Sequence, residues 1–400
     1  MIVFTLIGVW ELCKFGDGIA QIGDGIHGTP SYVEDGDVFF INGNNLVNGK
    51  IVISQETKSV DESQLTNTEK SLNGNTILMS INGTIGNLAW YHGEKVMLGK
   101  STAYLKVSDF NKEFIYTLLQ TEKTSNYFKS NLTGTTIKNL GLKTIRETPA
   151  LIPTSLEQKK IGIFFNSIED IITLHQRKLD QLKELKKAYL QVMFPEKDER
   201  VPKLRFADFE EEWELCKLGQ VANYRRGSFP QPYGNKEWYD GENSMPFVQV
   251  VDVGDNLRLV EDTKQKISEL AQPKSVFVKE GKVVVTLQGS IGRVAITQYP
   301  AYVDRTLLIF ESYKAEMDEY YFAYVIQQLF EYEKTRAPGG TIKTVTKEAL
   351  SDFTISFPSI EEQKKLGKFF EQLDDTITLH QNKLEQLKEL KKSYLQNMFI

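Results

Sequence analysis

Two long stretches of the chain carry apolar residues at three- and four-residue steps, the spacing of an amphipathic helix. The first runs from Gln158 to Phe194 and the second from Gln363 to Phe399, and most of their positions are identical. The offset is 363 minus 158, or 205 residues. Such agreement does not arise by chance, so the pattern predicts two copies of one long helix and an internal repeat.

Each helix has a start signal. Ser359 followed by Glu362 is typical of a capping box, and Ser155 followed by Gln158 repeats it. Lysines gather in the C-terminal half of each helix, where positive charge interacts favourably with the helix dipole. We expect these lysines to lie on a solvated face: Lys183, Lys186 and Lys187, with their copies Lys388, Lys391 and Lys392.

Weaker echoes extend the repeat over the rest of the chain. WELCKFG from Trp10 recurs as WELCKLG from Trp213, NGTIG from Asn82 as QGSIG from Gln288, and TGTTIK from Thr133 as GGTIK from Gly339. The chain therefore consists of two half-proteins in tandem, each with a variable part and a nearly constant helix.

The variable parts show short β-branched and aromatic runs broken by glycine and asparagine, which predict strands and turns. Examples are VFFINGNN from Val38, KVVVTLQGSIG from Lys282 and YVDRTLLIF from Tyr302. Helical patterns cover Phe114 to Phe128 and Glu319 to Arg336. Each variable part is therefore predicted to be a globular α+β domain, called a head below.

The predicted organisation is a first head over 1–154, a helix over 155–194, a linker over 195–212, a second head over 213–357 and a helix over 358–400. Antiparallel pairing of the two helices as a coiled coil would relate the halves by a pseudo-twofold axis. The expected pairing residues are Ile168, Ile172, His175, Leu179 and Leu182 on one helix, and Leu373, Ile377, His380, Leu384 and Leu387 on the other. Such a pair would cross near His175 and His380.

Composition narrows the class of protein. The formal net charge of −5 argues against coating DNA by bulk electrostatics, so any nucleic-acid contact has to be local. Cys13 and Cys216 occupy the same local sequence, which predicts equivalent packing positions and no disulfide. No metal site and no membrane span are expected. The apolar first ten residues are interpreted as a buried strand, and a cytoplasmic protein is expected.

Over nearly its full length the chain resembles the specificity subunits of type I restriction-modification systems. The resemblance rests on the repeated helix, the WELCKLG opening, and the GSIG and GGTIK motifs. It implies two target recognition domains, each reading one half of a split DNA sequence, and helices that set the spacer and dock two methyltransferase (M) subunits. VPKLRFADFEEEW precedes the second head and only MIVFTLIGVW the first, so the first head is expected either to be truncated at its start or to begin at a mis-assigned methionine.

The same resemblance implies that this chain binds double-stranded DNA and carries neither catalytic residues nor a cofactor. S-adenosylmethionine, ATP and Mg²⁺ are expected on its partners, the M subunits and the restriction/translocase (R) subunits.

Base readout needs arginine, lysine, asparagine or glutamine on exposed loops. The strongest candidate is the polar and aromatic loop from Tyr224 to Gly241, which also contains Phe229 and Trp238. The candidate contacts of the second head are Arg225, Arg226, Gln231, Tyr233, Asn235, Lys236, Gln288, Arg293, Arg305 and Lys343. Those of the first head are His27, Thr29, Tyr32, Asn42, Asn44, Asn45, Lys100 and Lys138.

Three patterns have a simpler explanation than catalysis. GDGIHG from Gly23 matches a dinucleotide-binding pattern, but Pro30 follows it and no helix is predicted there. The E-Q-K triples from Glu157 and Glu362 resemble part of a nuclease metal site, yet they stand at helix starts, where capping is expected. The two histidines on the helix stripes are interpreted as structural.

Two other functions stay open. One is a stand-alone or orphan DNA-binding protein without a catalytic partner, and co-purification of a methyltransferase would separate it from a specificity subunit. The other is a coiled-coil scaffold that never touches DNA, which the arginine-rich loop and the two different heads disfavour.

Overall fold

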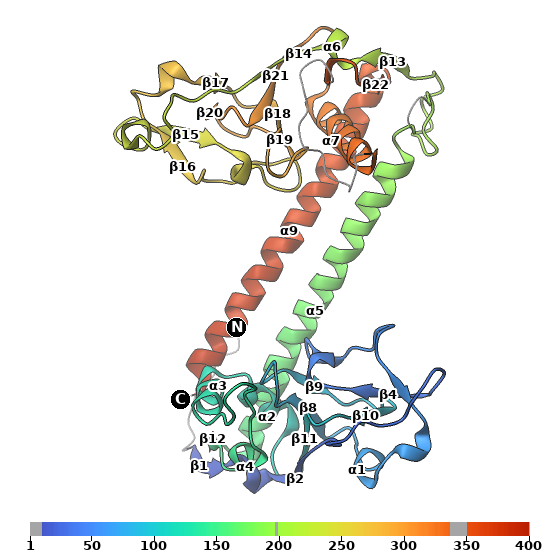
Figure 1. Ribbon diagram of the computed structural model, residues 1–400, viewed down its shortest axis with the longest axis vertical. Helices are drawn as coiled ribbons and strands as arrows, with labels where there is room; N and C mark the ends of the chain where they lie inside the picture. Colours follow the sequence, from blue (N-terminus) through green and yellow to red (C-terminus); the bar gives the residue numbers. More distant parts are fainter. Residues whose placement is uncertain (1–9, 197–198, 337–349, 400) are drawn as a thin grey trace. The chain divides into compact units, whose positions relative to one another are not determined.

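The computed structural model describes residues 10–196, 199–336 and 350–399. The chain divides into two compact units, Met1–His175 with Lys383–Ile400, and Gln176–Asn382. Each unit contains one head together with part of each long helix, α5 (Ser155–Val192) and α9 (Ile360–Met398) (Figure 1). The first nine residues lie outside the described residues, so the strand expected there is not tested.

The first head contains two four-stranded sheets, with strand orders β2-β11-β8-β9 and β10-β4-β7-β3. Its strands are β1 (Glu11–Lys14), β2 (Ile19–Asp24), β3 (Tyr32–Val33), β4 (Val38–Ile41), β5 (Leu46–Val47), β6 (Lys50–Ile51), β7 (Ser59–Val60), β8 (Thr76–Ser80), β9 (Leu88–Trp90), β10 (Val96–Leu98), β11 (Thr102–Val107) and β12 (Pro149–Ile152). Its helices are η1 (Phe15–Gly18), η2 (Gly43–Asn45), η3 (Glu62–Gln64), α1 (Asn67–Lys70), α2 (Lys112–Leu119), α3 (Glu122–Ser130) and α4 (Leu142–Arg146).

The second head repeats this plan with sheets β14-β21-β18-β19 and β16-β15-β20-β17. Its strands are β13 (Glu214–Lys217), β14 (Ala222–Arg226), β15 (Met245–Val248), β16 (Gln265–Ile267), β17 (Val276–Val278), β18 (Val283–Thr286), β19 (Val294–Ile296), β20 (Ala301–Val303), β21 (Leu307–Tyr313) and β22 (Thr354–Phe357). Its helices are α6 (Leu218–Val221), η4 (Lys236–Trp238), η5 (Val250–Asp252), η6 (Gln272–Lys274) and α7 (Glu319–Arg336).

The uninterrupted apolar runs belong to strands buried on both faces. In β18, Val283 and Val285 face a core shared with α7, whereas Val284 faces a second core against the neighbouring sheet. Alternate strand residues point to opposite faces, so burial of both faces requires apolar residues throughout. The helix predicted over Glu319–Arg336 is confirmed, while the one predicted over 114–128 breaks into α2 and α3, because Thr121 caps α3.

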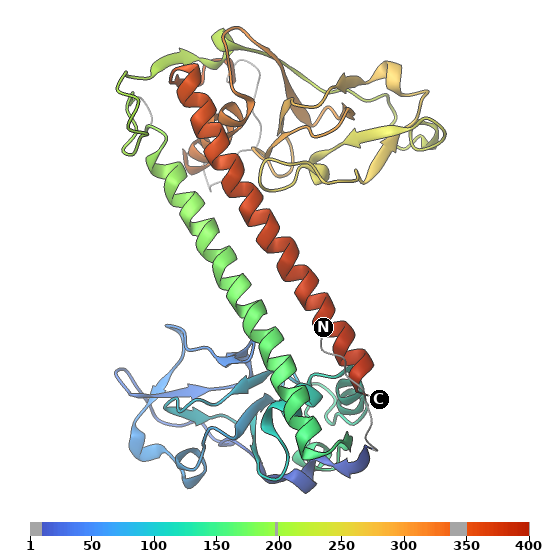
Figure 2. The same ribbon diagram turned by 180° about the vertical axis from the view of Figure 1, so that it is seen from behind.

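The helices run antiparallel in both units. In the first unit, Phe164 stacks edge-on against Tyr394 (5.0 Å between ring centroids) and Phe165 lies near Phe399 (5.9 Å). From Phe164 to Glu169 along α5, the contacted residue of α9 moves back from Tyr394 to Lys391, and Figure 2 shows the end of α9 beside the beginning of α5. Lys391 of α9 forms an ion pair with Glu169 of α5.

The second unit repeats these contacts with the two helices exchanged. Phe369 of α9 lies against Tyr189 of α5 (5.2 Å), and Phe370 against Phe194 (5.8 Å). Lys186 Nζ lies 2.6 Å from Asp374 Oδ1. These residues match those of the first unit at the offset of the repeat, so each unit contains equivalent helix contacts.

Most of the predicted pairing residues are covered. Ile168, Leu179, Leu182, Ile377, Leu384 and Leu387 are buried, and Ile172, His175, Leu373 and His380 are half-buried. The predicted approach of the two histidines joins different units and stays a prediction.

Two details of the helices differ from expectation. Ser155 is not the cap of α5; Thr154 is, since its carbonyl accepts from Gln158 N (2.9 Å) and its hydroxyl from Glu157 N (3.4 Å). The lysine run is solvated except at one position in each copy. Lys186 and Lys391 keep only 13% and 16% of their side chains exposed, because their charges pair with Asp374 and Glu169.

The end of each long helix completes the core of a head. Met398 at the end of α9 and Phe399 just after it are buried in the core of the first head, and Met193 and Phe194 after α5 in that of the second. Segment 199–212, expected as a linker, contains no helix or strand, yet Arg205 makes two 2.7 Å hydrogen bonds to the Glu362 carboxylate. It is therefore attached to the start of α9.

Candidate nucleic-acid interface

The loop after β2 shows how the edge of the first head is assembled. Gly25 N donates to Thr102 O (3.1 Å), and Ile26 N donates to Leu98 O (2.8 Å). A Cβ on Gly25 would lie 1.9 Å from Leu98 O, so glycine is required for this close approach. The next element is strand β3, not a helix. The glycines of GDGIHG thus have a packing role.

The second head contains the same arrangement. Gly227 N donates to Leu307 O (3.1 Å), and Ser228 N donates to Val303 O (3.0 Å). A Cβ on Gly227 would lie 2.2 Å from Val303 O. The two loops singled out from the sequence, one in each head, are therefore structurally equivalent.

A second loop in each head follows β8 or β18. In QGSIG, Gly289 and Gly292 have φ of +64° and +84°, and Gly83 and Gly86 of NGTIG have φ of +73° and +92°. These left-handed conformations favour glycine. Ile81 N donates to Ser101 O (2.9 Å) and, equivalently, Leu287 N donates to Thr306 O (2.8 Å).

The second loop bonds to the turn before β11 or β21, and the first loop bonds to the strand residues on either side of that turn. The turn carries Lys100 in the first head and Arg305 in the second. Each head thus holds several loops around one exposed cation on a rigid backbone frame. The frame is the same in both heads and the side chains differ. This arrangement suits two domains that read different sequences.

Most first-head candidates lie on this edge. His27, Thr29, Tyr32, Asn44, Lys100 and Lys138 are exposed. His27 Nε2 lies 2.8 Å from Asp24 Oδ2 and its side chain is 74% exposed. Lys138 precedes Asn139, which bridges to Asn82 of the NGTIG loop. These side chains are available to a ligand outside the domain.

Asn42 and Asn45 also bond within their own head, and their assignment as base contacts stays a prediction. The Asn42 Oδ1 accepts from Ser101 Oγ (2.9 Å). The Asn45 Oδ1 accepts from Asn42 N (2.9 Å), and its Nδ2 donates to Val52 O (3.0 Å). Their amides hold the turn after β4, because asparagine readily bonds to nearby backbone.

The Tyr224–Gly241 loop is less of a contact surface than its composition indicates. Phe229 and Trp238 are buried with Phe247 in a small core, so these aromatic residues serve packing. Asn235 Oδ1 accepts from Glu237 N (3.2 Å) and caps η4. Four candidates of this loop are exposed: Arg225, Arg226, Gln231 and Lys236.

The two adjacent arginines leave their strand on opposite faces. Both belong to β14, where Arg225 pairs with Ile309 and Arg226 with Leu308. Consecutive strand residues point to opposite faces. Arg225 Nη1 lies 4.0 Å from Glu311 Oε1, and both side chains are about half exposed, so this ion pair is weak.

The remaining second-head candidates differ in availability. Gln288 is exposed in the QGSIG loop. Arg293 is 35% exposed and pairs with Asp255 at 3.3 Å. Tyr233 donates from its hydroxyl to Asp304 Oδ2 (2.5 Å), and burial followed by this bond raises the pKa of Tyr233. Lys343 lies outside the described residues.

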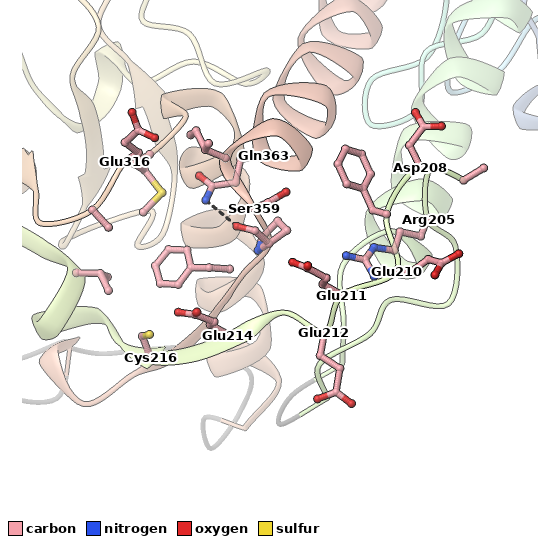
Figure 3. A pocket seen from close by; sticks show the side chains of 18 residues that line it. Arg205, Asp208, Glu210, Glu211, Glu212, Glu214, Cys216, Glu316, Ser359 and Gln363 are labelled. Atoms are coloured by element: carbon pink, nitrogen blue, oxygen red, sulfur yellow. Dashed lines mark hydrogen bonds between the residues drawn. The ribbon is translucent and has the colours of Figure 1, made fainter.

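One cavity can be excluded as a nucleic-acid site. A space of about 780 Å³ lies between segment 205–216 and the start of α9 (Figure 3). Its carboxylates are those of Asp208, Glu210, Glu211, Glu212, Glu214 and Glu316. Phosphate groups are repelled by such a concentration of negative charge.

Sequence reasoning missed residues that join helix and head. Gln158 Nε2 donates to Pro153 O (2.9 Å) and its Oε1 accepts from Asn111 N (2.9 Å). Gln363 makes the equivalent bonds to Pro358 O and from Asp318 N. The E-Q-K triples are thus structural, and their recurrence at the repeat offset was the available signal. In the described residues no group of three or more His, Cys, Asp or Glu side chains could hold a metal ion.

Within the described part of the chain, no helix is long and apolar enough to cross a membrane. The sequence matches the family described as "Type I restriction modification DNA specificity domain" over residues 14–184 and 210–389.

Two relatives come from Methanocaldococcus jannaschii. The chain is 22% identical to the putative type I restriction enzyme MjaX specificity subunit, over 78% of this chain and 73% of the relative. It is also 22% identical to the type I restriction enzyme MjaVIII specificity subunit, over 83% and 80%. The fold resembles a crystal structure of the type I restriction-modification system S subunit from M. genitalium, with a TM-score of 0.68, 14% identity and coverage of 100% and 98%.

Proposed function

Because the chain belongs to the family of type I restriction-modification DNA specificity domains, we propose that it reads a DNA target in two parts and directs partner methyltransferase and restriction subunits to it. That membership confirms the prediction of a DNA-recognition subunit rather than an enzyme. The observation that carries the proposal is the equivalent loop frame in both heads, with different side chains on it. One head reads each half-site.

The charge distribution supports local contact. The chain has a net charge of −5, so attraction to phosphate has to come from the exposed cations of the two frames. Lys100 and Lys138 supply it in the first head, and Arg305 and Lys236 in the second. Phosphate contacts position the heads, and neighbouring polar side chains such as Asn44 read bases.

Exposed leucines support two equal docking positions for methyltransferase subunits. On α5, Leu174 stands nine residues beyond Phe165, and on α9, Leu390 stands nine residues before Phe399, so they lie level in the first unit. They are 69% and 45% exposed.

In the second unit the equivalent pair is Leu379, also 69% exposed, and Leu185, 43% exposed. In this proposal one methyltransferase subunit covers the two exposed leucines of each unit. S-adenosylmethionine, ATP and Mg²⁺ belong to the partner subunits in this proposal.

The test is methylation in cells. The chain is co-expressed with its methyltransferase, and methylated positions are mapped across the genome. A motif of two short specified halves separated by unspecified bases is expected. Without co-purifying methyltransferase, or with a continuous motif, the bipartite assignment fails and the orphan DNA-binding protein takes its place.

Docking is tested by the amount of methyltransferase that co-purifies. Leu174→Ser is expected to remove about one of two bound subunits, and Leu174→Ser with Leu379→Ser both, since each substitution removes one apolar contact. Lys178→Ser with Lys383→Ser, also exposed and related by the repeat, is the control and should change nothing. Full binding to the double leucine variant would reject these docking positions.

A further inference from the structure

The second head contains a small cavity beside its exposed cation. It has a volume of about 380 Å³, at the lower end of ligand pockets. Its lining comes from the turn after β15, the start of β16 and the turn before β21: Tyr233, Gln249, Val250, Val251, Lys264, Gln265, Asp304, Arg305 and Thr306. The cavity therefore collects amide, cationic and aromatic groups at the edge where the equivalent loop frame lies.

Arg305 is held in a defined position in this cavity. Its guanidinium carbon lies 4.9 Å from the centre of the Tyr233 ring. The ring itself is fixed, because it stacks on Phe229 (5.0 Å between centroids) and its hydroxyl donates to Asp304. An arginine stacked on an aromatic face keeps its in-plane N–H groups available for a ligand.

Asp304 anchors this arrangement. Its residue is 2% exposed. One carboxylate oxygen accepts from Thr306 N (2.9 Å) and Thr306 Oγ1 (2.5 Å), and the other from Tyr233 (2.5 Å). These three hydrogen bonds hold the carboxylate in place, directly before Arg305 in the chain. The fixed Tyr233 ring thus orients the exposed guanidinium.

We propose that Arg305 reads a guanine in the half-site of the second head, and that Tyr233 and Asp304 position it. This inference rests on the proposed function. A guanidinium matches guanine because two of its N–H groups reach O6 and N7 at once. Orientation before binding reduces the entropy lost on forming that contact. Lys100, at the equivalent turn of the first head, has a single ammonium and no such fork.

The test uses the full chain with its methyltransferase. Wild type and variants are bound to duplexes in which each base pair of the target is changed in turn. Arg305→Ala is expected to reduce the preference for guanine at one position of one half-site by about 10- to 100-fold, the range of a bidentate contact. The other half-site should be unaffected. Arg305→Lys should keep most of the overall affinity and lose the same preference.

Two further variants test whether the guanine preference depends on how Arg305 is positioned or only on the presence of a positive charge. Tyr233→Phe keeps the ring under Arg305 and removes the bond to Asp304, so a smaller loss of the same guanine preference is expected. Arg200→Ala removes an arginine that is 55% exposed in segment 199–212 and should change no base preference. Thermal unfolding of each variant shows whether the head is intact, and Arg305→Lys carries the test if Arg305→Ala unfolds.

The outcomes are distinct. If wild type selects no bipartite target, the proposed function fails and the inference fails with it. If wild type selects one and Arg305→Ala keeps every base preference, only the inference is overturned. It is equally overturned if the lost preference is for another base, or if binding weakens uniformly for all sequences, because Arg305 would then contact phosphate.

Discussion

At the scale of single residues, the least expected feature is one buried lysine in each solvated lysine run. Lys186 reaches Asp374, whose side chain is 6% exposed and also accepts from the Tyr324 hydroxyl. Burial, followed by the charge of Asp374, raises the pKa of Tyr324, so this phenol stays protonated and acts as a donor. In the first unit Lys391 contacts Glu169 and Gln120. Each lysine run thus contains exposed lysines and one largely covered lysine that forms an ion pair.

Lys186→Met is expected to lower the stability of the second unit by about 3 to 5 kcal/mol, the cost of leaving a buried charge unpaired. Lys187→Met, one residue along and exposed, should be nearly neutral. Chemical denaturation of both variants measures the difference. Equal stability of the two would show that Asp374 is not a buried charge that needs its lysine.

At the scale of secondary structure, the capping residue at the start of α5 differs between the sequence pattern and the structure. Both Thr154 and Ser155 are good capping residues in the sequence. The structure assigns the cap to Thr154, and Ser155 is the first residue of the helix.

Thr154→Ala should therefore cost about 1 kcal/mol, the usual value for losing an N-cap, whereas Ser155→Ala should cost close to nothing. The readout is the unfolding free energy of each variant. If Ser155→Ala lowers the unfolding free energy more than Thr154→Ala does, Ser155 is the cap, as the capping-box pattern indicates.

At the scale of the whole molecule, both long helices pass through both units, so their length is expected to set the spacer of the DNA target. An insertion between Lys187 and Phe194 would lengthen α5 but would not test whether helix length sets the spacer. Tyr189, Met193 and Phe194 pack into the second head, and such an insertion would displace them from its core.

Four residues inserted in both helices, after His175 and after Asn382, keep the paired contacts of each unit. An α-helix rises about 1.5 Å per residue, so the helices lengthen by about 6 Å, close to two base pairs. The methylated motif should keep its specified halves while the spacer grows by one or two base pairs. A folded variant with an unchanged spacer would show that the helices do not set the distance.

The sequence by itself determined the features that depend on periodicity and on repetition. Both are local properties: the amphipathic spacing requires α5 and α9, and the offset of 205 residues requires two equivalent halves. The family follows from the same residues, and the match over both halves confirms it. Exposed candidates such as Lys100 and Arg305 could also be identified from the sequence, because cationic residues in predicted loops are usually exposed.

Only the tertiary structure decided which polar and aromatic residues are available. Asn42 bonds to Ser101, 59 residues along the chain, and Phe229 and Trp238 are buried with Phe247 and Ile267, because the fold brings these segments together. The strand geometry of β14 likewise divides Arg225 from Arg226. The burial of Met193 and Met398 in the heads could not be seen along the chain either. Residues far apart in sequence make these contacts, and no local pattern encodes them.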